Sequence, residues 1–294
     1  MALHSSQLKT NAIWKGQLVD EILSKEELKV HSIFSRVINI KAEENMVSLA
    51  WRRAGRAAGY ISIAEEVDFK KLCIPINSSI AVKDSIMHFD GPLSVDMKST
   101  YIWLDKVDEH TRWNEKHLSI ENVAALKSAV DRYGAAESLW KNSPEIIRRL
   151  AVLSPEESIK SILGFGSGLT PGGDDAIIGF LAAVDSKEGN DEFSNRLKAQ
   201  ILGNIKATTD ISSQFLKLAC SRHYHEYLQD ALLAIIHGSP ENALWYAKKL
   251  ISIGSSSGTD LAGGMYLGFT QKLKFEMAGD NLAEKDSNQD KCLL

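Results

Sequence analysis

Two adjacent aspartates, Asp174 and Asp175, occupy the stretch of the sequence that is richest in chemical possibilities. They follow a glycine-rich turn at residues 164–173 and open an apolar run at residues 176–184. Carboxylates beside accessible backbone can hold Mg²⁺, act as a general base or accept a hydrogen bond from a ligand amide. They can also simply cap a helix, so the residue types alone leave these roles open.

A second turn, residues 254–260, resembles the first and ends in Asp260. Asp175 and Asp260 each have a glycine two residues earlier and another four residues later, at Gly179 and Gly264 respectively. Small residues four positions apart lie on one face of a helix and allow close packing. The pattern therefore predicts two helices that cross at these glycines, with both N-termini and both turns on the same side.

Helix N-termini expose unpaired N–H groups, and glycine lets a ligand approach the backbone, so a phosphate or carboxylate is the expected guest. The alternative interpretation is that both turns are tight connectors with helix-capping acids. No lysine follows the glycines as in a Walker A loop, and helical texture precedes the turn where a dinucleotide fingerprint needs a strand. The candidate catalytic residues are Asp174, Asp175 and Asp260, and the candidate ligand-binding residues are Gly166, Ser167, Gly168, Thr170, Gly172, Gly173, Thr208, Ser212, Ser255, Ser256, Ser257 and Gly258.

The overall composition excludes several classes of protein. A net charge of -4 without basic runs gives no general attraction to nucleic acid. No stretch approaches the run of about 20 apolar residues that a membrane helix needs. With only three dispersed cysteines, a reduced, cytoplasmic setting is expected.

The texture of the sequence predicts an α+β protein in four segments. Residues 1–106 are expected to form a β-rich N-terminal domain, a small barrel or antiparallel sheet, with a short leading helix around residues 12–28. A linker at 107–118 leads to a helical domain at 119–277 that carries both turns, and a disordered tail is expected at 278–294. Strand-like runs include residues 30–40, 46–50, 60–63, 72–76, 80–82, 86–89, 93–97 and 101–104.

Helix starts in the second half have clear signals. Ser119 is a predicted N-cap, and Ser143 and Ser154 each precede a proline and a glutamate, the pattern of a cap followed by proline at the first helical position. Further helices are predicted at 175–185, 190–206, 209–220, 224–237, 240–251 and 260–275.

Four stretches resemble the AllH-like family, formerly catalogued as a domain of unknown function. They are Gly164–Asp175, Phe89–Val95, the helix start Thr208–Leu216, and Gly254–Asp260. The first motif is specific, and the resemblance covers most of residues 30–275. Two positions depart from the pattern: Gly172 stands where the family is expected to have serine, and Ser255 where it is expected to have histidine.

The resemblance implies a subunit of an oxamate carbamoyltransferase, a transferase of allantoin degradation and purine catabolism. Its reaction converts oxalurate and phosphate into oxamate and carbamoyl phosphate. The implied partners are a small anionic metabolite (phosphate, oxamate or a carbamoyl compound) and the other subunits of an oligomeric complex. No cofactor is firmly implied, although Asp174 and Asp175 remain candidates for Mg²⁺.

Two other functions stay open at this point. One is a non-catalytic ligand-binding or scaffold subunit, or a metabolite sensor. The other is a Mg²⁺-dependent hydrolase or phosphotransferase that acts through Asp174 and Asp175.

Overall fold

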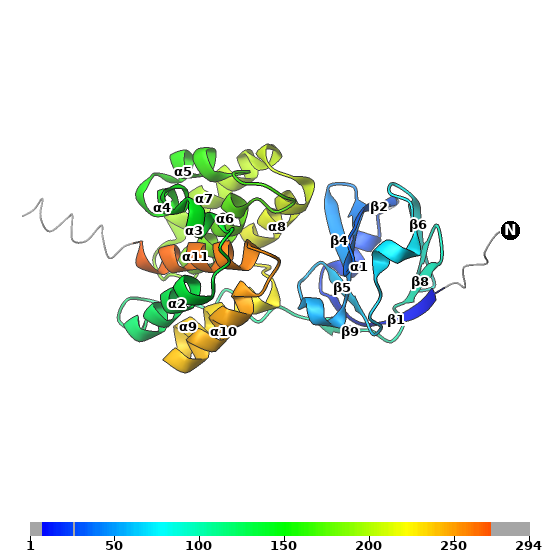
Figure 1. Cartoon of the computed structure of the whole chain (residues 1–294), viewed down its shortest axis with the longest axis horizontal. Coiled ribbons are helices and arrows are strands. Elements are labelled where there is room, and N and C mark those ends of the chain that lie inside the picture. Colours follow the sequence, from blue (N-terminus) through cyan, green and yellow to red (C-terminus); the bar gives the residue numbers. More distant parts are fainter. Residues whose placement is uncertain (1–7, 26, 272–294) are drawn as a thin grey trace, which may run out of the picture. The chain divides into compact units, whose positions relative to one another are not determined.

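The computed structural model describes residues 8–25 and 27–271, which form two compact units. One unit contains Met1–Asp108 together with Ser221–Gln229, and the other contains Glu109–Cys220 and the chain from Asp230 onward. Figure 1 shows strands in the first unit and helices in the second. The expected tail at 278–294 lies outside the described residues.

The first unit is an eight-stranded β-barrel, so the prediction of a small barrel is confirmed. Among the described residues, its ring follows the order β5-β4-β3-β2-β6-β7-β8-β1, and an antiparallel β1–β5 pairing closes it. β9 pairs in parallel with the last part of β1. The strands are β1 (Leu8–Gly16), β2 (Leu28–Ile33), β3 (Val37–Ala42), β4 (Asn45–Trp51), β5 (Tyr60–Ile63), β6 (Ser79–Lys83), β7 (Ile86–Phe89), β8 (Leu93–Asp96) and β9 (Tyr101–Trp103).

Closing the sheet removes its edges and leaves an interior that side chains can fill. That interior is apolar: Ile38, Ile40, Ile61, Met87 and Leu93 are fully buried. Ile38 and Ile40, like Ile61 and Ile63, are two residues apart, because alternate residues of a strand point to the same face.

The short helix expected within residues 12–28 is present as α1 (Val19–Leu23), but the strand β1 precedes it and was not predicted. One strand prediction is wrong. The run at residues 72–76 is not a strand, since it follows a 3-10 helix (Phe69–Leu72) and Cys73 has a left-handed backbone with φ 53°. The apolar run at 30–40 forms parts of two strands, β2 and β3.

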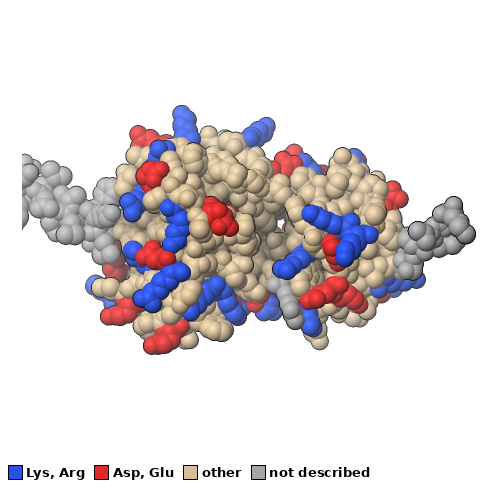
Figure 2. Space-filling view, viewed as in Figure 1, with Lys and Arg blue, Asp and Glu red and all other residues tan. Residues whose placement is uncertain are grey.

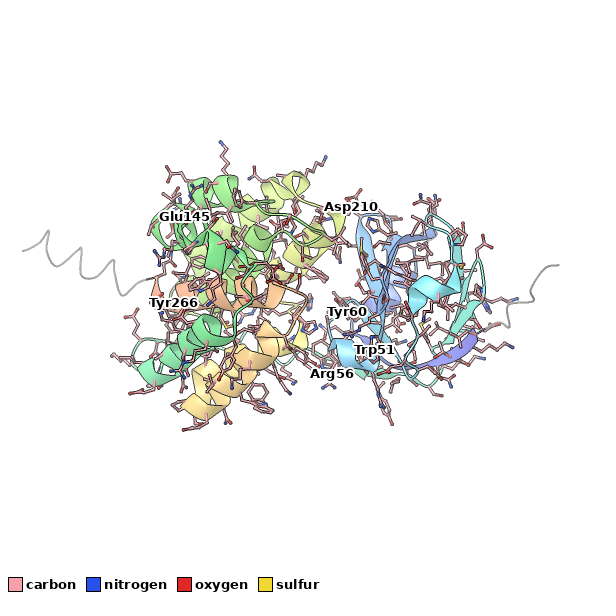
Figure 3. The ribbon with its side chains drawn as sticks, in the orientation of Figure 1. Trp51, Arg56, Tyr60, Glu145, Asp210 and Tyr266 are labelled. Atoms are coloured by element: carbon pink, nitrogen blue, oxygen red, sulfur yellow. The ribbon has the colours of Figure 1, made fainter. Side chains whose placement is uncertain are left out.

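The segment Ser221–Gln229 belongs to the barrel unit through specific polar contacts. Arg56 forms an ion pair with Glu226, and the Nδ1 atom of His223 lies 2.6 Å from an Asp105 carboxylate oxygen. Figure 3 shows Arg56 with Trp51 and Tyr60 in this unit. The positive charge of Arg56 is therefore paired with the Glu226 carboxylate within this unit.

The second unit consists of helices whose starts agree with the sequence signals. Ser119 and Ser154 accept hydrogen bonds from backbone N–H groups three residues later, and Ser154 forms a full capping box with Glu157. Ser143 occupies a cap position but makes no side-chain cap bond. The helices are α2 (Ile120–Tyr133), α3 (Leu139–Asn142), α4 (Pro144–Val152), α5 (Pro155–Ile162), α6 (Gly172–Asp185), α7 (Asp191–Gly203), α8 (Asp210–Cys220), α9 (Glu226–His237), α10 (Pro240–Ile251) and α11 (Ser257–Thr270). The first residues of α9, up to Gln229, belong to the barrel unit.

Helices α6 and α11 form the centre of this unit, and α6 is buried from Gly173 to Asp185. A Cβ atom at Gly179 would lie 1.9 Å from the Leu261 carbonyl oxygen, and one at Gly264 would lie 2.0 Å from that of Ala176. The helices run parallel, with both N-termini at one end. This confirms the predicted crossing, in which glycine permits backbone-to-backbone contact that any side chain would prevent.

No helix within the described residues is long and apolar enough to cross a membrane. Figure 2 shows acidic and basic side chains interspersed over the face drawn there, without a continuous basic surface.

Candidate functional site

The two glycine-rich turns share one packing device. A Cβ atom at Gly173 would lie 2.3 Å from the Ile162 carbonyl oxygen, and one at Gly258 would lie 2.1 Å from the Leu250 carbonyl oxygen. Each glycine thus lets the first turn of a new helix pack against the end of the preceding helix.

The amides of the same two glycines are also engaged within the protein. The Gly173 N–H donates to the Phe165 carbonyl at 2.9 Å, and the Gly258 N–H donates to the Ile253 carbonyl at 3.0 Å. The expectation that Gly173 and Gly258 bind an anion therefore needs correction, because their N–H groups already have partners and their Cα atoms face protein carbonyls.

The outer part of the first turn offers accessible backbone. Gly166, Ser167 and Gly168 are exposed, and the two glycines have φ values of 120° and 96°. A Cβ atom at Gly168 would meet nothing within 4 Å. A ligand can reach the backbone here, and a left-handed φ explains the choice of glycine at both positions.

Asp174 ties the first turn to α8. It is fully buried and accepts a hydrogen bond of 2.7 Å from the Gly164 N–H, one of 2.6 Å from the Ser212 hydroxyl and one from the Thr208 hydroxyl. Burial raises the pKa of Asp174, against the lowering effect of these three donors. The hydroxyls of Thr208 and Ser212, both predicted to contact ligand, donate to this carboxylate.

Asp260 has a comparable role at the second turn. It is 1% exposed and accepts hydrogen bonds from the backbone N–H groups of Trp140 at 2.7 Å and Leu139 at 3.2 Å. Burial raises its pKa to about 6, although both N–H donors lower it. A Cβ atom at Gly172 would lie 2.7 Å from this carboxylate, which accounts for glycine at the position where serine was expected.

Asp175 differs from both neighbours because its Oδ2 atom is buried without a hydrogen-bond partner. The residue is 4% exposed. Burial raises its pKa well above 3.8. Side-chain hydrogen bonds from Ser257 and Thr170 to the carboxyl group lower the pKa, and the Asp260 and Asp174 carboxylates raise it. An unpaired buried oxygen is costly, and such groups are frequent where a protein does chemistry.

The two hydroxyls that hydrogen-bond to this carboxyl group also join the two turns. Thr170 Oγ1 and Ser257 Oγ lie 2.9 Å apart, and both residues are half-buried. Of the other serines in the second turn, Ser255 is exposed, and Ser256 occupies the N-cap of α11 without a side-chain cap bond. The site thus contains hydroxyl groups at its surface and a carboxyl group beneath them.

Within residues 8–25 and 27–271, no group of three or more His, Cys, Asp or Glu side chains is arranged to hold a metal ion. Coordination of Mg²⁺ by Asp174 would require exchange of the three hydrogen bonds that its oxygens accept. The Mg²⁺ interpretation stays a prediction.

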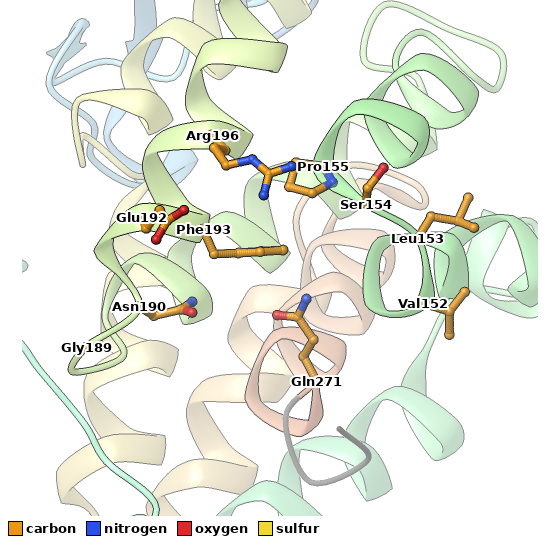
Figure 4. Close-up of a pocket in the computed structure, with 10 residues that line it drawn as sticks. All are labelled: Val152, Leu153, Ser154, Pro155, Gly189, Asn190, Glu192, Phe193, Arg196 and Gln271. Atoms are coloured by element: carbon orange, nitrogen blue, oxygen red, sulfur yellow. The ribbon is translucent and has the colours of Figure 1, made fainter. Parts of the chain in front are cut away.

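A separate cavity of about 550 Å³ lies elsewhere in the helical unit (Figure 4). Its wall includes Phe193 and Arg196 of α7, and Arg196 is paired with Glu156 at 2.9 Å. None of the predicted site residues lines it.

Two protein-family models match this chain. The model described as oxamate carbamoyltransferase subunit AllH matches residues 162–269, which include both turns, and the model of the AllH family N-terminal domain matches residues 7–102. The chain belongs to the AllH family. The two matches correspond to the helical unit around α6 and α11 and to the barrel. No solved structure matches the chain.

Sequence reasoning missed the loop that leads into α3 as part of this candidate site. The Leu139 and Trp140 amides bind Asp260, and Thr259 Oγ1 accepts a hydrogen bond of 2.9 Å from the Ala135 N–H. These contacts join residues more than 100 positions apart, so no local pattern indicates them. Ser138 caps α3 and accepts a hydrogen bond from the Lys141 N–H, a local contact that says nothing of Asp260.

Proposed function

We propose that this AllH protein carries the substrate site of an oxamate carbamoyltransferase, in which oxalurate and phosphate give oxamate and carbamoyl phosphate. The site lies at the paired N-termini of α6 and α11. The observation that carries this proposal is the buried Asp175 carboxyl group, with an unpaired Oδ2 atom, beneath the joined hydroxyls of Thr170 and Ser257. Family membership supports the subunit role, and the geometry supports the position of the site.

The proposed ligands are anions that also carry amide groups. The exposed backbone at Gly166–Gly168 and the N-terminal ends of two helices favour the carboxylate or phosphate part. Hydroxyl groups can both donate and accept, so Thr170 and Ser257 match the carbonyl and NH₂ of a carbamoyl group.

In this proposal the three aspartates have different roles. Asp174 and Asp260 hold the turns in place, because their oxygens accept hydrogen bonds from the protein. Asp175 is the candidate catalytic group, because it alone of the three has a buried oxygen without a partner.

Two matched glycine variants test the location of the site. Gly168 and Gly189 both have positive φ, 96° and 68°, and a Cβ atom at either would meet nothing within 4 Å. Gly168→Ala and Gly189→Ala therefore introduce similar backbone strain, but only Gly168 lies in the proposed site. We expect Gly168→Ala to weaken oxamate binding to the purified chain by about tenfold or more, the scale of one lost contact of about 1.4 kcal/mol.

Titration calorimetry with oxamate, carbamoyl phosphate and inorganic phosphate measures this binding, with and without Mg²⁺. Equal oxamate affinities of the two variants would show that the turn is not part of the site. The proposed function would be refuted if the unaltered chain bound none of these ligands and its assembled complex showed no turnover. Binding without any effect of Asp175→Asn on turnover would favour the scaffold or sensor alternative. Strict dependence of phosphate binding on Mg²⁺ would favour the hydrolase or phosphotransferase alternative.

A further inference from the structure

We propose that Thr170, Ser257 and Asp175 form a proton relay that carries the proton exchanged in the reaction, with Asp175 as its buried end. This inference rests on the proposed function and assigns a mechanism to the same site. It is carried by the hydroxyl pair that joins the two turns, by the hydrogen bonds of Ser257 and Thr170 to the Asp175 carboxyl group, and by the buried Oδ2 atom of that group, which has no partner of its own.

The burial of the three groups defines the order of the relay. Asp175 is 4% exposed and its Oδ2 atom is inaccessible, whereas Thr170 and Ser257 are half-buried. A bound substrate therefore meets the hydroxyls first. Their 2.9 Å separation allows one to donate to the other, and each hydroxyl can accept one proton as it releases another.

The electrostatics favour the protonated form of Asp175. The titratable groups that act on Asp175 are Asp260 on α11 and Asp174 on its own helix, and both carboxylates raise its pKa in addition to burial. Like-charged carboxylates that share a site resist ionising together. The ionised form of Asp175 is therefore disfavoured beside these carboxylates, so a proton that Asp175 releases is readily taken back.

The proposed reaction needs such a carrier. A phosphate oxygen bonds to the carbamoyl carbon of oxalurate, and the bond from that carbon to the amide nitrogen breaks, with its electron pair moving to nitrogen. The nitrogen must gain a proton to leave as oxamate, and hydrogen phosphate must lose one to become the phosphoryl group of carbamoyl phosphate. The relay delivers the first proton from Asp175 and returns the second to it, so atoms and charge balance.

The test compares four variants in the assembled enzyme that contains this chain. Asp175→Asn removes the proton store, Thr170→Val and Ser257→Ala each remove one hydroxyl, and Thr170→Ser restores one. We expect Asp175→Asn to lower kcat for oxalurate phosphorolysis by about 10²- to 10⁴-fold, the usual range for loss of general acid–base catalysis. Each hydroxyl deletion should lower kcat by at least about tenfold. Thr170→Ser should retain most activity. All four should bind oxamate, which lacks the transferred carbamoyl group, with an affinity within about threefold of the unaltered chain, a difference below 1 kcal/mol.

Two further readouts separate a relay from a structural role. The unaltered enzyme should lose activity as the pH rises and Asp175 loses its proton. The residual activity of Asp175→Asn should not show this loss. The double variant Asp175→Asn, Ser257→Ala should have a kcat no more than about threefold below that of Asp175→Asn alone. The effects of substitutions within one catalytic unit do not add.

A serine outside the site supplies the control. Ser252 is exposed, and its hydroxyl donates to the Lys249 carbonyl at 2.6 Å. Ser252→Ala should keep full activity.

Unchanged kcat in Thr170→Val and Ser257→Ala would overturn the relay while leaving the proposed function intact. A parallel fall in kcat and oxamate affinity would overturn it as well, since the hydroxyls would then only bind. Failure of the unaltered chain to bind oxamate, together with absence of turnover by the complex, would instead refute the underlying function.

Discussion

The turn before α6 and the turn before α11 are alike in backbone packing and unlike in the environment of their acids. Gly173 and Gly258 press against the carbonyls of Ile162 and Leu250 in the same way. Yet Asp260 accepts two backbone N–H groups, whereas Asp175, at the corresponding position, has an unpaired buried oxygen. A repeated motif can therefore specify how two helices pack, while the residues around each copy determine the environment of its carboxyl group.

The largest effect is expected where the two turns are alike, at the helix crossing that they share. A Cβ atom at Gly264 would lie 2.0 Å from the Ala176 carbonyl oxygen, so Gly264→Ala should prevent folding or lower the free energy of unfolding by more than about 3 kcal/mol. Gly203→Ala, where a Cβ atom meets nothing within 4 Å, should be neutral or slightly stabilising. Urea unfolding of both variants measures the difference. Equal midpoints would show that the crossing tolerates a side chain.

The next effect distinguishes Asp174 from its neighbour. Asp174→Ala leaves the Gly164 N–H and the Thr208 and Ser212 hydroxyls without their acceptor. We expect a loss of roughly 3–5 kcal/mol in the free energy of unfolding, since each unsatisfied buried donor costs about 1–3 kcal/mol. Urea unfolding at pH 7 measures it, with exposed Asp191→Ala as the control. A loss below about 1 kcal/mol would contradict a role for Asp174 in holding the turn.

A pH-dependent effect is expected at Asp260. Its pKa is about 6 in the folded chain against 3.8 ordinarily, so the folded state holds the proton more tightly than the unfolded state. The resulting stabilisation is fully present below pH 3.8 and is lost as the pH rises through about 6. Its size is at most about 3 kcal/mol, the value of a two-unit shift. Unfolding of the unaltered chain and of Asp260→Asn between pH 4 and about 7.5 should show a less steep decline for the variant. Parallel curves would exclude this titration.

The smallest stability effect is expected at Asp175, the residue with the largest proposed effect on activity. Asn has nearly the same shape and carries no charge, so Asp175→Asn should change the free energy of unfolding by less than about 1 kcal/mol at pH 7. The comparison with Asp174→Ala then separates the two adjacent acids. A loss of several kcal/mol with full activity in the complex would reverse their roles.

Much of the fold was predictable because its signals are local. Ser119 and Ser154 begin helices as expected, since a cap and its partner amide lie within one turn. β1 was not predicted, because its strand conformation depends on pairing with β5 and β8, which are distant from it in the sequence. Likewise, residues 72–76 have the composition of a strand but no neighbouring strand to pair with among the described strands.

By itself, the sequence determined the positions of most helices, the barrel-then-helix order, the family and the crossing of α6 and α11 at Gly179 and Gly264. These follow from periodicity, caps and small-residue spacing, which act over a few residues. Only the tertiary structure decided what each aspartate does. Neighbouring residues of a helix point about 100° apart, so Asp174 and Asp175 meet different surroundings. Those surroundings come from distant segments: Thr208 and Ser212 satisfy one carboxylate, while the other keeps an unpaired oxygen beneath two hydroxyls.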